Sequence, residues 1–290
     1  MQTIPKDSRQ QVLSTRIANR YAGRCRPGVP SSVRRVAMIL AVICLQTVPG
    51  AAKPPGSAAA AKPRRTPRST ITIVTLGDSI TKGVRRGVTA QQTFSARLEK
   101  SLRRAGRQVR VVNVGIGGER TDQALKRLKA DVIARRPALV TIMYGTNDSY
   151  VDRGRTTSRI SRQTYRKNLI ALVSQLRRAQ IVPVLMTEPR WGANAKPNGA
   201  GEHPNVRLEK YMLECRAVAK KLRVPLVDHF AVWSRAARKG TDIGGWTTDQ
   251  CHPNPHGHEV VAKTMLPVLQ KVLAGRKRIT TDERQQPDPR

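Results

Sequence analysis

The stretch Ile71-Thr-Ile-Val-Thr-Leu-Gly-Asp-Ser79 decides the reading of the fold. Its first six residues are β-branched apart from one leucine, and such a run is typical of a short buried strand. Gly77 ends the run and allows a tight turn, because glycine tolerates backbone conformations that other residues avoid. The stretch therefore predicts a strand whose end presents the polar side chains of Asp78 and Ser79.

The rest of the body repeats this alternation of strand and helix. Further strands are predicted at residues 109–112, 139–143, 182–186 and 225–227, with a possible irregularity at Pro183. Helices are predicted over 94–105, from a cap at Thr121 to a break before Pro137, around 165–176, over 208–222 and over 256–273. Strands that alternate with helices of this kind favour a parallel sheet covered on both faces. The predicted fold class is therefore α/β, a three-layer α/β/α sandwich with a flavodoxin-like parallel five-stranded sheet.

The chain is expected to hold one folded domain with flanking segments. Residues 1–52 read as an N-terminal signal region, because Arg34-Arg35 precede a 13-residue apolar run that ends before small residues. That run is short for a membrane span, so we expect an exported protein, periplasmic or secreted, that is not integral to the membrane after processing. Residues 53–69 read as a Pro-, Ala- and Lys/Arg-rich linker, residues 70–275 as the domain, and residues 276–290 as a disordered tail.

The composition limits the classes of binding partner but identifies no specific one. The formal net charge of the 290 residues is +35, and residues 70–275 alone hold 36 Lys and Arg against 15 Asp and Glu. Such a body attracts anionic surfaces weakly and over long range, but no nucleic-acid-binding signature accompanies the charge and aromatic residues make up only 3%. We expect no specific nucleic acid partner. Cys215 and Cys251 are expected to be core thiols, and a bridge between them is left open.

Four polar segments follow the predicted strands or precede the last helix. They are Gly77-Asp78-Ser79, Asn113-Val-Gly-Ile-Gly-Gly118, Gly145-Thr-Asn147-Asp148 and Asp249-Gln-Cys-His252-Pro-Asn. In parallel α/β sheets the loops beyond the carboxyl ends of the strands build the site. We therefore expect the four segments to meet at one edge of the sheet.

The residues in these segments are those that acyl transfer needs. A serine hydroxyl such as that of Ser79 attacks a carbonyl only if a base takes its proton, and His252 is the candidate base. Asp249 can hold that histidine in one tautomer and stabilise it once protonated. Donors for the tetrahedral oxyanion are expected from the Ser79 N–H, a backbone N–H of the loop Gly-Ile-Gly-Gly118 and the Asn147 side chain.

These motifs resemble those of the SGNH, or GDSL-type, hydrolases over about residues 71–265. The family's four named residues correspond here to Ser79, Gly118, Asn147 and His252. Gly-Asp-Ser-Ile-Thr and His-Pro-Asn-x-x-Gly-His resemble the lysophospholipase- and arylesterase-like branch. The resemblance implies a sandwich fold and metal-free ester hydrolysis without a cofactor. One departure is Gly117-Gly118-Glu119 in place of the common Ser-Gly-Asp, which is expected to make this loop more pliable.

Nearby residues are expected to have other roles. Asp78 and Asp148 are expected to orient loops by accepting hydrogen bonds. The pair Asp228-His229 is expected to be structural, because adjacent side chains tend to point apart. A metal site at His252, His256 and His258 is disfavoured because no carboxylate or cysteine set with ligand spacing accompanies the histidines, and His258 is expected to pack at the start of the last helix.

The predicted function is a serine esterase or acylhydrolase acting on small acyl esters or lysolipids. The alternative within the same fold is a carbohydrate O-acetylesterase, so the expected substrate is an acyl ester, a lipid or an acetylated sugar. The alternative outside enzymes is a basic module that binds anionic polymer. Acyl length depends on the loops 187–204 and 240–248, where Trp191 and Trp246 either line the cleft or pack at its rim.

Overall fold

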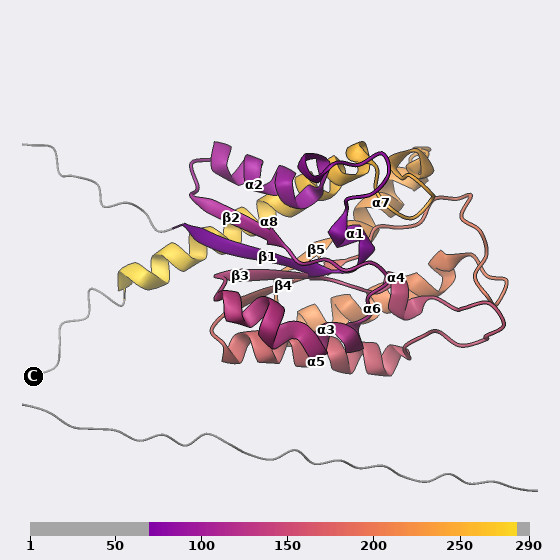
Figure 1. The fold of residues 1–290 in the computed structure, drawn as a ribbon, viewed down its shortest axis with the longest axis horizontal. Coiled ribbons are helices and arrows are strands. Elements are labelled where there is room, and N and C mark those ends of the chain that lie inside the picture. The colour runs from indigo at the N-terminus through magenta and orange to yellow at the C-terminus, as the bar shows by residue number, and fades with distance from the viewer. Residues whose placement is uncertain (1–69, 283–290) are drawn as a thin grey trace, which may run out of the picture. The chain divides into compact units, whose positions relative to one another are not determined.

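A computed structural model of the chain describes residues 70–282 (Figure 1). A five-stranded parallel sheet in the order β2-β1-β3-β4-β5 forms its centre. The strands are β1 (Ile71–Gly77), β2 (Val109–Asn113), β3 (Leu139–Met143), β4 (Val182–Thr187) and β5 (Leu226–Asp228). The predicted sandwich is confirmed.

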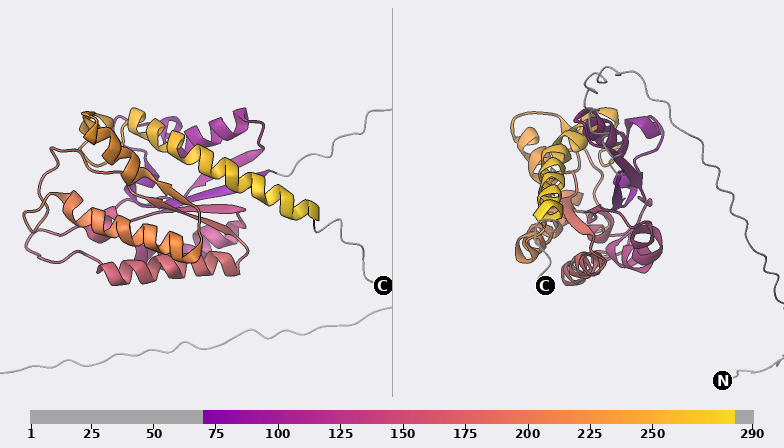
Figure 2. Two further views of the ribbon diagram at one scale, coloured as in Figure 1. Left: turned by 180° about the vertical axis from the view of Figure 1, so that it is seen from behind. Right: turned by 90° about the vertical axis from the view of Figure 1, so that its left-hand side faces the viewer.

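Helices cover both faces of the sheet, as Figures 1 and 2 show. On one face lie α2 (Phe94–Arg104), α7 (His229–Arg238) and α8 (Pro255–Asp282), and on the other lie α3 (Thr121–Arg127), α5 (Arg162–Arg178) and α6 (Pro204–Leu222). Two short helices, α1 (Ser79–Lys82) and α4 (Thr146–Ser149), come just after β1 and β3. Shorter turns are η1 (Ala90–Gln92), η2 (Leu128–Val132), η3 (Ile133–Arg135) and η4 (Ile243–Trp246). No helix within residues 70–282 is both long enough and apolar enough to cross a bilayer.

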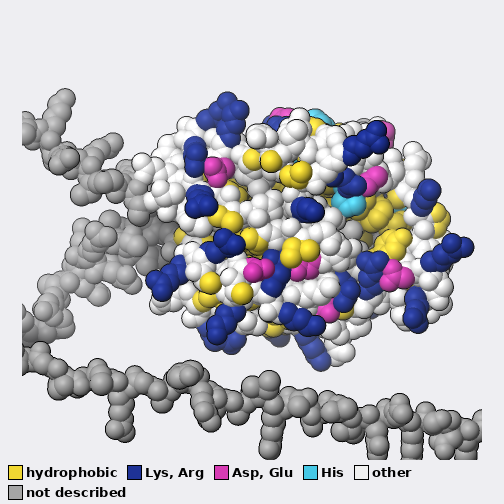
Figure 3. Space-filling view, viewed as in Figure 1, with side chains coloured by type: hydrophobic (Ala, Val, Ile, Leu, Met, Phe, Trp, Pro, Cys, Tyr) yellow, Lys and Arg dark blue, Asp and Glu magenta, His cyan; other side chains and the backbone are white. Residues whose placement is uncertain are grey.

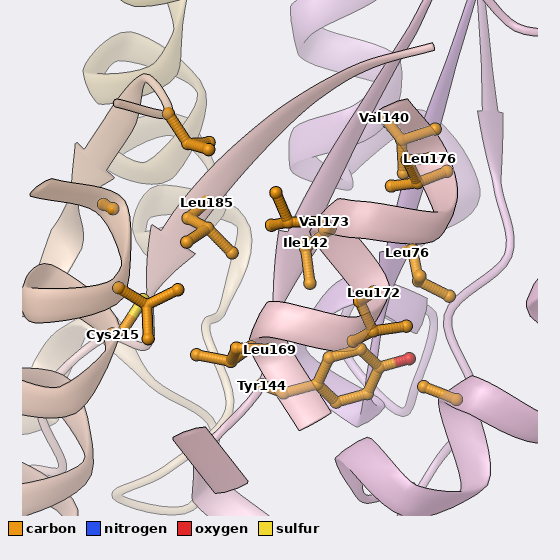
Figure 4. Close-up of a cluster of buried hydrophobic side chains, with 14 of the residues drawn as sticks. Leu76, Val140, Ile142, Tyr144, Leu169, Leu172, Val173, Leu176, Leu185 and Cys215 are labelled. Atoms are coloured by element: carbon orange, nitrogen blue, oxygen red, sulfur yellow. The ribbon is translucent and has the colours of Figure 1, made fainter. Parts of the chain in front are cut away.

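The apolar strand residues divide between two cores according to the period of two in a strand. Val74 and Leu76 of β1 enter the cluster under α5, whereas Ile73 enters the cluster under α2 and α8. Figure 4 shows Leu76 in the first cluster, close to Leu172 of α5. Because both faces of β1 are covered, its residues from Ile73 onward are buried, which explains the nearly unbroken apolar run.

One expected helix boundary is wrong. Thr121 does not cap a helix: it is the first residue of α3, and its hydroxyl donates to Asp148 instead. The helical segment ends before Pro137, as expected; within it the backbone widens into η2 at Leu128 and closes with the tight turn η3, which ends at Arg135.

The C-terminal boundary also differs from the expectation. Residues 276–282 prolong α8 beyond the expected domain end at residue 275, so the part of the expected tail that is described is helical. The physical reason is that Gly275 is followed by Arg-Lys-Arg-Ile-Thr-Thr, which contains no proline or further glycine to stop the helix. The expected signal region, the linker and residues 283–290 lie outside the described residues. Pro183 causes no break, since β4 pairs continuously with β3 through it.

Leu172→Ala tests the packing of the core under α5. Leu172 is fully buried, so we expect its truncation to lower the free energy of unfolding by about 2–5 kcal/mol in urea denaturation. Leu213→Ala on α6 is the matched control, because Leu213 is 56% exposed and its loss should change stability by less than about 0.5 kcal/mol. Equal losses in the two variants would contradict the packing described here.

Candidate active site

Ser79 sits at a sharp transition from the inner strand β1 into the short helix α1. The turn needs glycine at position 77, because a Cβ there would lie 2.6 Å from the carbonyl oxygen of Met143. Asp78 caps α1, its Oδ1 accepting the Ile80 N–H at 2.9 Å. Ser79 thus opens the helix, with an N–H that has no acceptor inside it.

The side chains of Ser79, His252 and Asp249 form one hydrogen-bonded chain. Ser79 Oγ lies 2.8 Å from His252 Nε2, and His252 Nδ1 lies 2.8 Å from Asp249 Oδ2 and 3.0 Å from Oδ1. A carboxylate only accepts hydrogen bonds, so Nδ1 carries the proton and Nε2 is free to accept from the serine hydroxyl. The loop is further held by the His252 N–H, which donates to Asp249 Oδ1 at 2.8 Å.

The protonation states of His252 and Asp249 suit a histidine that acts as a general base. Burial lowers the pKa of His252 below its usual value and outweighs the opposing effect of Asp249, so the ring is neutral at neutral pH. Burial alone would raise the pKa of Asp249, but hydrogen bonds from the His252 N–H and ring and the ring's charge bring it below its ordinary value. A neutral imidazole beside an ionised carboxylate is therefore the resting arrangement.

Arg85 is a site residue that the sequence did not reveal. Its Nη2 donates to Asp249 Oδ2 at 2.8 Å, and both side chains are partly exposed. Arg85 comes from the loop after α1, so it ties that loop to the one that carries the histidine. No spacing in the sequence links two residues that lie 164 positions apart.

Asn147 is held beside the serine turn by contacts at both ends of its amide. Its Nδ2 donates to Asp78 Oδ2 at 2.9 Å, and its Oδ1 accepts from Arg159 Nη1 at 3.3 Å. The arginine contact defines which end of the amide carries the nitrogen. One of the two Nδ2 protons is used by Asp78, and the other is available to a ligand.

Buried carboxyl groups lie beneath this turn. Asp78 and Asp148 are hydrogen-bond acceptors, as expected, and their donors lie at the starts of short helices: Asp148 Oδ1 accepts the N–H of Thr121, the first residue of α3, at 3.0 Å. Burial raises the pKa of Asp148 to about 6. Glu188, which follows β4, is fully buried, and burial together with the charges of Asp78 and Asp148 raises its pKa well above the usual range. The raised pKa of Glu188 reduces the negative charge that is buried beside Asp78 and Asp148.

The loop from Asn113 to Glu119 packs against the serine turn. The Ile116 N–H donates to the carbonyl oxygen of Gly77 at 3.0 Å, and a Cβ on Gly115 would lie 2.7 Å from the backbone carbon of Thr81. Gly118 is exposed with φ +76°, a conformation that glycine adopts without strain, and it has open space above it. The role of its N–H as an oxyanion donor stays a prediction.

Glu119 anchors the end of this loop, which was expected to be pliable. Its side chain is only 4% exposed and accepts from the Arg127 guanidinium and from Tyr144 Oη, the latter at 2.6 Å. Arg127 also donates to the Val114 carbonyl at 2.7 Å. Arg127 therefore contacts both ends of the loop. Glu119, which stands where the common pattern has Asp, provides the contact at the second end.

His256 and His258, which are close to His252 in the sequence, make contacts with other residues. His258 is buried and its Nδ1 accepts the Phe94 N–H at 3.2 Å, which agrees with the expected packing role. His256 is exposed and meets the ring of Trp246 edge-on, with 5.6 Å between ring centroids. Within residues 70–282 no three His, Cys, Asp or Glu side chains are grouped as a metal site would require.

The remaining residues considered in the sequence pack against other side chains or cap a helix. Asp228 caps α7 through the Ala231 N–H and pairs with Arg216, while His229 beside it is fully buried. Cys215 and Cys251 are both buried free thiols, as expected of core residues. Of the two loop tryptophans, Trp246 packs edge-on against Trp233, and Trp191 stacks on Tyr150 with 6.3 Å between ring centroids.

The site lies at the end of the domain toward which the strands run. Figure 1 places α1 and α4 together at this end, and Figure 3 shows there a hollow with a histidine and hydrophobic side chains at its rim. A serine hydroxyl on a neutral histidine, beside amide donors and a partly apolar hollow, is the arrangement of an acyl-transfer site.

Comparison with known proteins agrees with this chemistry. The sequence profile of the GDSL-like Lipase/Acylhydrolase family matches residues 75–260, and the chain belongs to this family. It is a carboxylic ester hydrolase of the SGNH type. The match begins inside β1 and ends inside α8, so it spans all four predicted motifs.

Relatives and solved structures are similar over most of their own length. The esterase TesA of Pseudomonas aeruginosa is 30% identical over 202 residues, which cover 70% of this chain and 89% of that protein. A Bacillus subtilis protein named uncharacterized lipoprotein YqeF is 32% identical over 196 residues, which cover 61% and 76%. The acetyl xylan esterase AlAXEase shares the fold with a TM-score of 0.57 and 24% identity, covering 67% of this chain and 98% of that one.

The acid limb of the pH profile tests the state of His252. Protonated His252 cannot accept the serine proton, so kcat/KM should fall as pH drops through its pKa, with a midpoint below 6.5. The charge of Arg85 helps to lower the pKa of His252, so in Arg85→Gln the midpoint should move to higher pH.

Arg86→Gln is the matched control for this measurement. Arg86 is the exposed neighbour of Arg85, and its replacement removes the same charge without touching Asp249. The control should keep the midpoint of the unaltered protein. Identical profiles for the two variants would show that the contact between Arg85 and Asp249 does not act on the histidine.

Proposed function

We propose that the chain hydrolyses carboxylic esters through an acyl-enzyme on Ser79, with His252 as base and Asp249 as its partner. The observation that carries this proposal is the chain of two 2.8 Å contacts from Ser79 Oγ through the imidazole to the Asp249 carboxylate. Membership of the esterase family supports it.

In the first half of the reaction Ser79 Oγ attacks the ester carbonyl while its proton passes to His252 Nε2. The tetrahedral oxyanion then receives hydrogen bonds from the Ser79 N–H, the Gly118 N–H and the free Nδ2 proton of Asn147. Asp249 stabilises the charged imidazole. The intermediate collapses when the imidazolium gives its proton to the departing alcohol oxygen, which leaves the acyl group on the serine.

In the second half a water molecule replaces the alcohol. His252 takes a proton from the water as it attacks the acyl carbon, and the same oxyanion donors act again. Collapse returns the proton to Ser79 Oγ and releases the carboxylic acid. Arg85 and Arg159 take no proton: they hold Asp249 and Asn147 in place through the contacts at 2.8 Å and 3.3 Å.

The substrate proposed first is an ester with a small acyl group. The rat relative named isoamyl acetate-hydrolyzing esterase 1 homolog is 25% identical over 190 residues and supports this choice. Lysolipids are a further substrate class that we propose for the same reaction.

A carbohydrate O-acetyl ester is the second candidate. It is favoured by a cavity of about 380 Å³ lined by Arg190, Trp191, His203 and Asp242, among others. An aromatic ring with surrounding polar groups suits a sugar, since the ring packs on the C–H face while the polar groups meet hydroxyls. The cavity adjoins the histidine loop, because the N–H of Gly192 donates to the Gln250 carbonyl at 2.8 Å.

We further propose that the protein is exported. The support is the signal-like pattern of residues 1–52, which lie outside the described residues, together with the name lipoprotein given to the Bacillus subtilis relative.

Ser79→Ala tests the proposed nucleophile. With aryl acetate, butyrate and laurate esters, acetylated xylo-oligosaccharide and lysophosphatidylcholine as a panel, the unaltered protein should turn over at least one, and the variant should lose at least about 1,000-fold in kcat. Ser101→Ala on α2 is the control and should keep full activity. Turnover that survives in Ser79→Ala, or its absence on every ester in the unaltered protein, would contradict the proposal.

A further inference from the structure

The end of the domain opposite Ser79 is built from the loops that lead into the strands. There α2, η3, α5 and α6 end, and β1 to β5 begin. Backbone hydrogen bonds hold these loops side by side: the Ile71 N–H donates to the Gln108 carbonyl at 2.9 Å, and the Val182 N–H donates to the Ala138 carbonyl at 3.3 Å. The loops therefore form one continuous surface.

This surface is strongly basic. Six of its side chains are exposed and make no ion pair or side-chain hydrogen bond within residues 70–282, and we call them the basal cationic face: Arg104, Arg136, Arg178, Lys220, Lys221 and Arg223. The stretches 104–110, 133–138, 177–182 and 219–226 contain no Asp or Glu. Figure 3 shows Lys and Arg side chains at this end of the domain, on the side where β1 begins.

Helix ends explain part of this pattern but not all of it. Basic residues in the last turn of a helix complement its dipole, which accounts for Lys220 and Lys221 in α6. Arg136 and Arg223 lie beyond the last turns of η3 and α6 with φ values of 46° and 49°. Glycine or asparagine is preferred in this left-handed conformation, and arginine is strained in it. Arg136 and Arg223 therefore place two positive charges on the loops of this end that the helix dipole does not account for.

We propose that the basal cationic face docks on a membrane surface of anionic lipids. Exposed cations spread over the loops at one end of the sheet match a plane of phosphate groups, and each Lys or Arg near such a surface strengthens binding about fivefold. A second argument comes from the order of the chain: β1 starts at this end, and in the sequence it directly follows the basic stretch 53–69.

The proposed docking fixes which way the catalytic end faces. β1 has seven residues, and at about 3.3 Å per residue it spans about 20 Å between the basal cationic face and Ser79. A domain docked through its base therefore presents Ser79 to the aqueous side. This orientation favours substrates that approach from solution over esters that stay in the same bilayer.

Vesicle binding by the full chain tests the proposal. The basal variant combines Arg104→Gln, Arg136→Gly, Arg178→Gln and Arg223→Gly, and the two glycines also relieve the strained backbone. The control variant removes the same charge from exposed residues elsewhere, with Lys126→Gln, Arg153→Gln, Arg155→Gln and Arg162→Gln. Turnover of a soluble ester shows that each variant is folded.

We expect the unaltered protein to sediment with phosphatidylglycerol vesicles at low salt and not with pure phosphatidylcholine vesicles. The basal variant should bind at least about 30-fold more weakly, and the control variant should lose much less. Equal losses would show that the charge acts diffusely and would overturn the proposal. Binding to polyphosphate that depends on the basal residues, without binding to anionic vesicles, would assign the face to a soluble polyanion instead.

Discussion

The hydrogen bond of 2.8 Å between Ser79 Oγ and His252 Nε2 is the contact on which the rest of the site depends. It joins the turn after β1 to the loop before the last helix, across 173 residues. Parallel strands make this possible because their carboxyl ends share one edge of the sheet. The surrounding contacts serve it: Asp78 caps the helix that Ser79 opens, and Asp249 holds the imidazole with Nε2 toward the serine.

Much of this arrangement could be predicted from the sequence because its signals are local. The run from Ile73 to Leu76 is buried on both faces, and a strand of that kind has few polar positions to obscure it. Turn residues after each strand then mark the edge of the sheet. Ser79, Asn147 and the loop with Asp249 and His252 were all expected at that edge, and the structure places Ser79 in contact with His252.

The supporting contacts could not be predicted, because they are made by long side chains across loops. Arg85 and Asp249, or Arg159 and Asn147, carry no mutual signal in spacing or periodicity. Glu119 was visible only as a departure from a familiar pattern, and its burial against Arg127 depends on where α3 lies. The expected domain end at residue 275 was wrong for a different, local reason: no proline or further glycine follows Gly275 to stop α8.

The covalent intermediate gives the most direct test of the account. The unaltered protein is mixed with an activated aryl acetate, quenched in acid during turnover, digested, and examined by mass spectrometry. The account predicts one acetyl group on the peptide that contains Ser79, and no labelled peptide in Ser79→Ala. An acetyl group on another residue during productive turnover, or turnover with the Ser79 peptide never labelled, would contradict it.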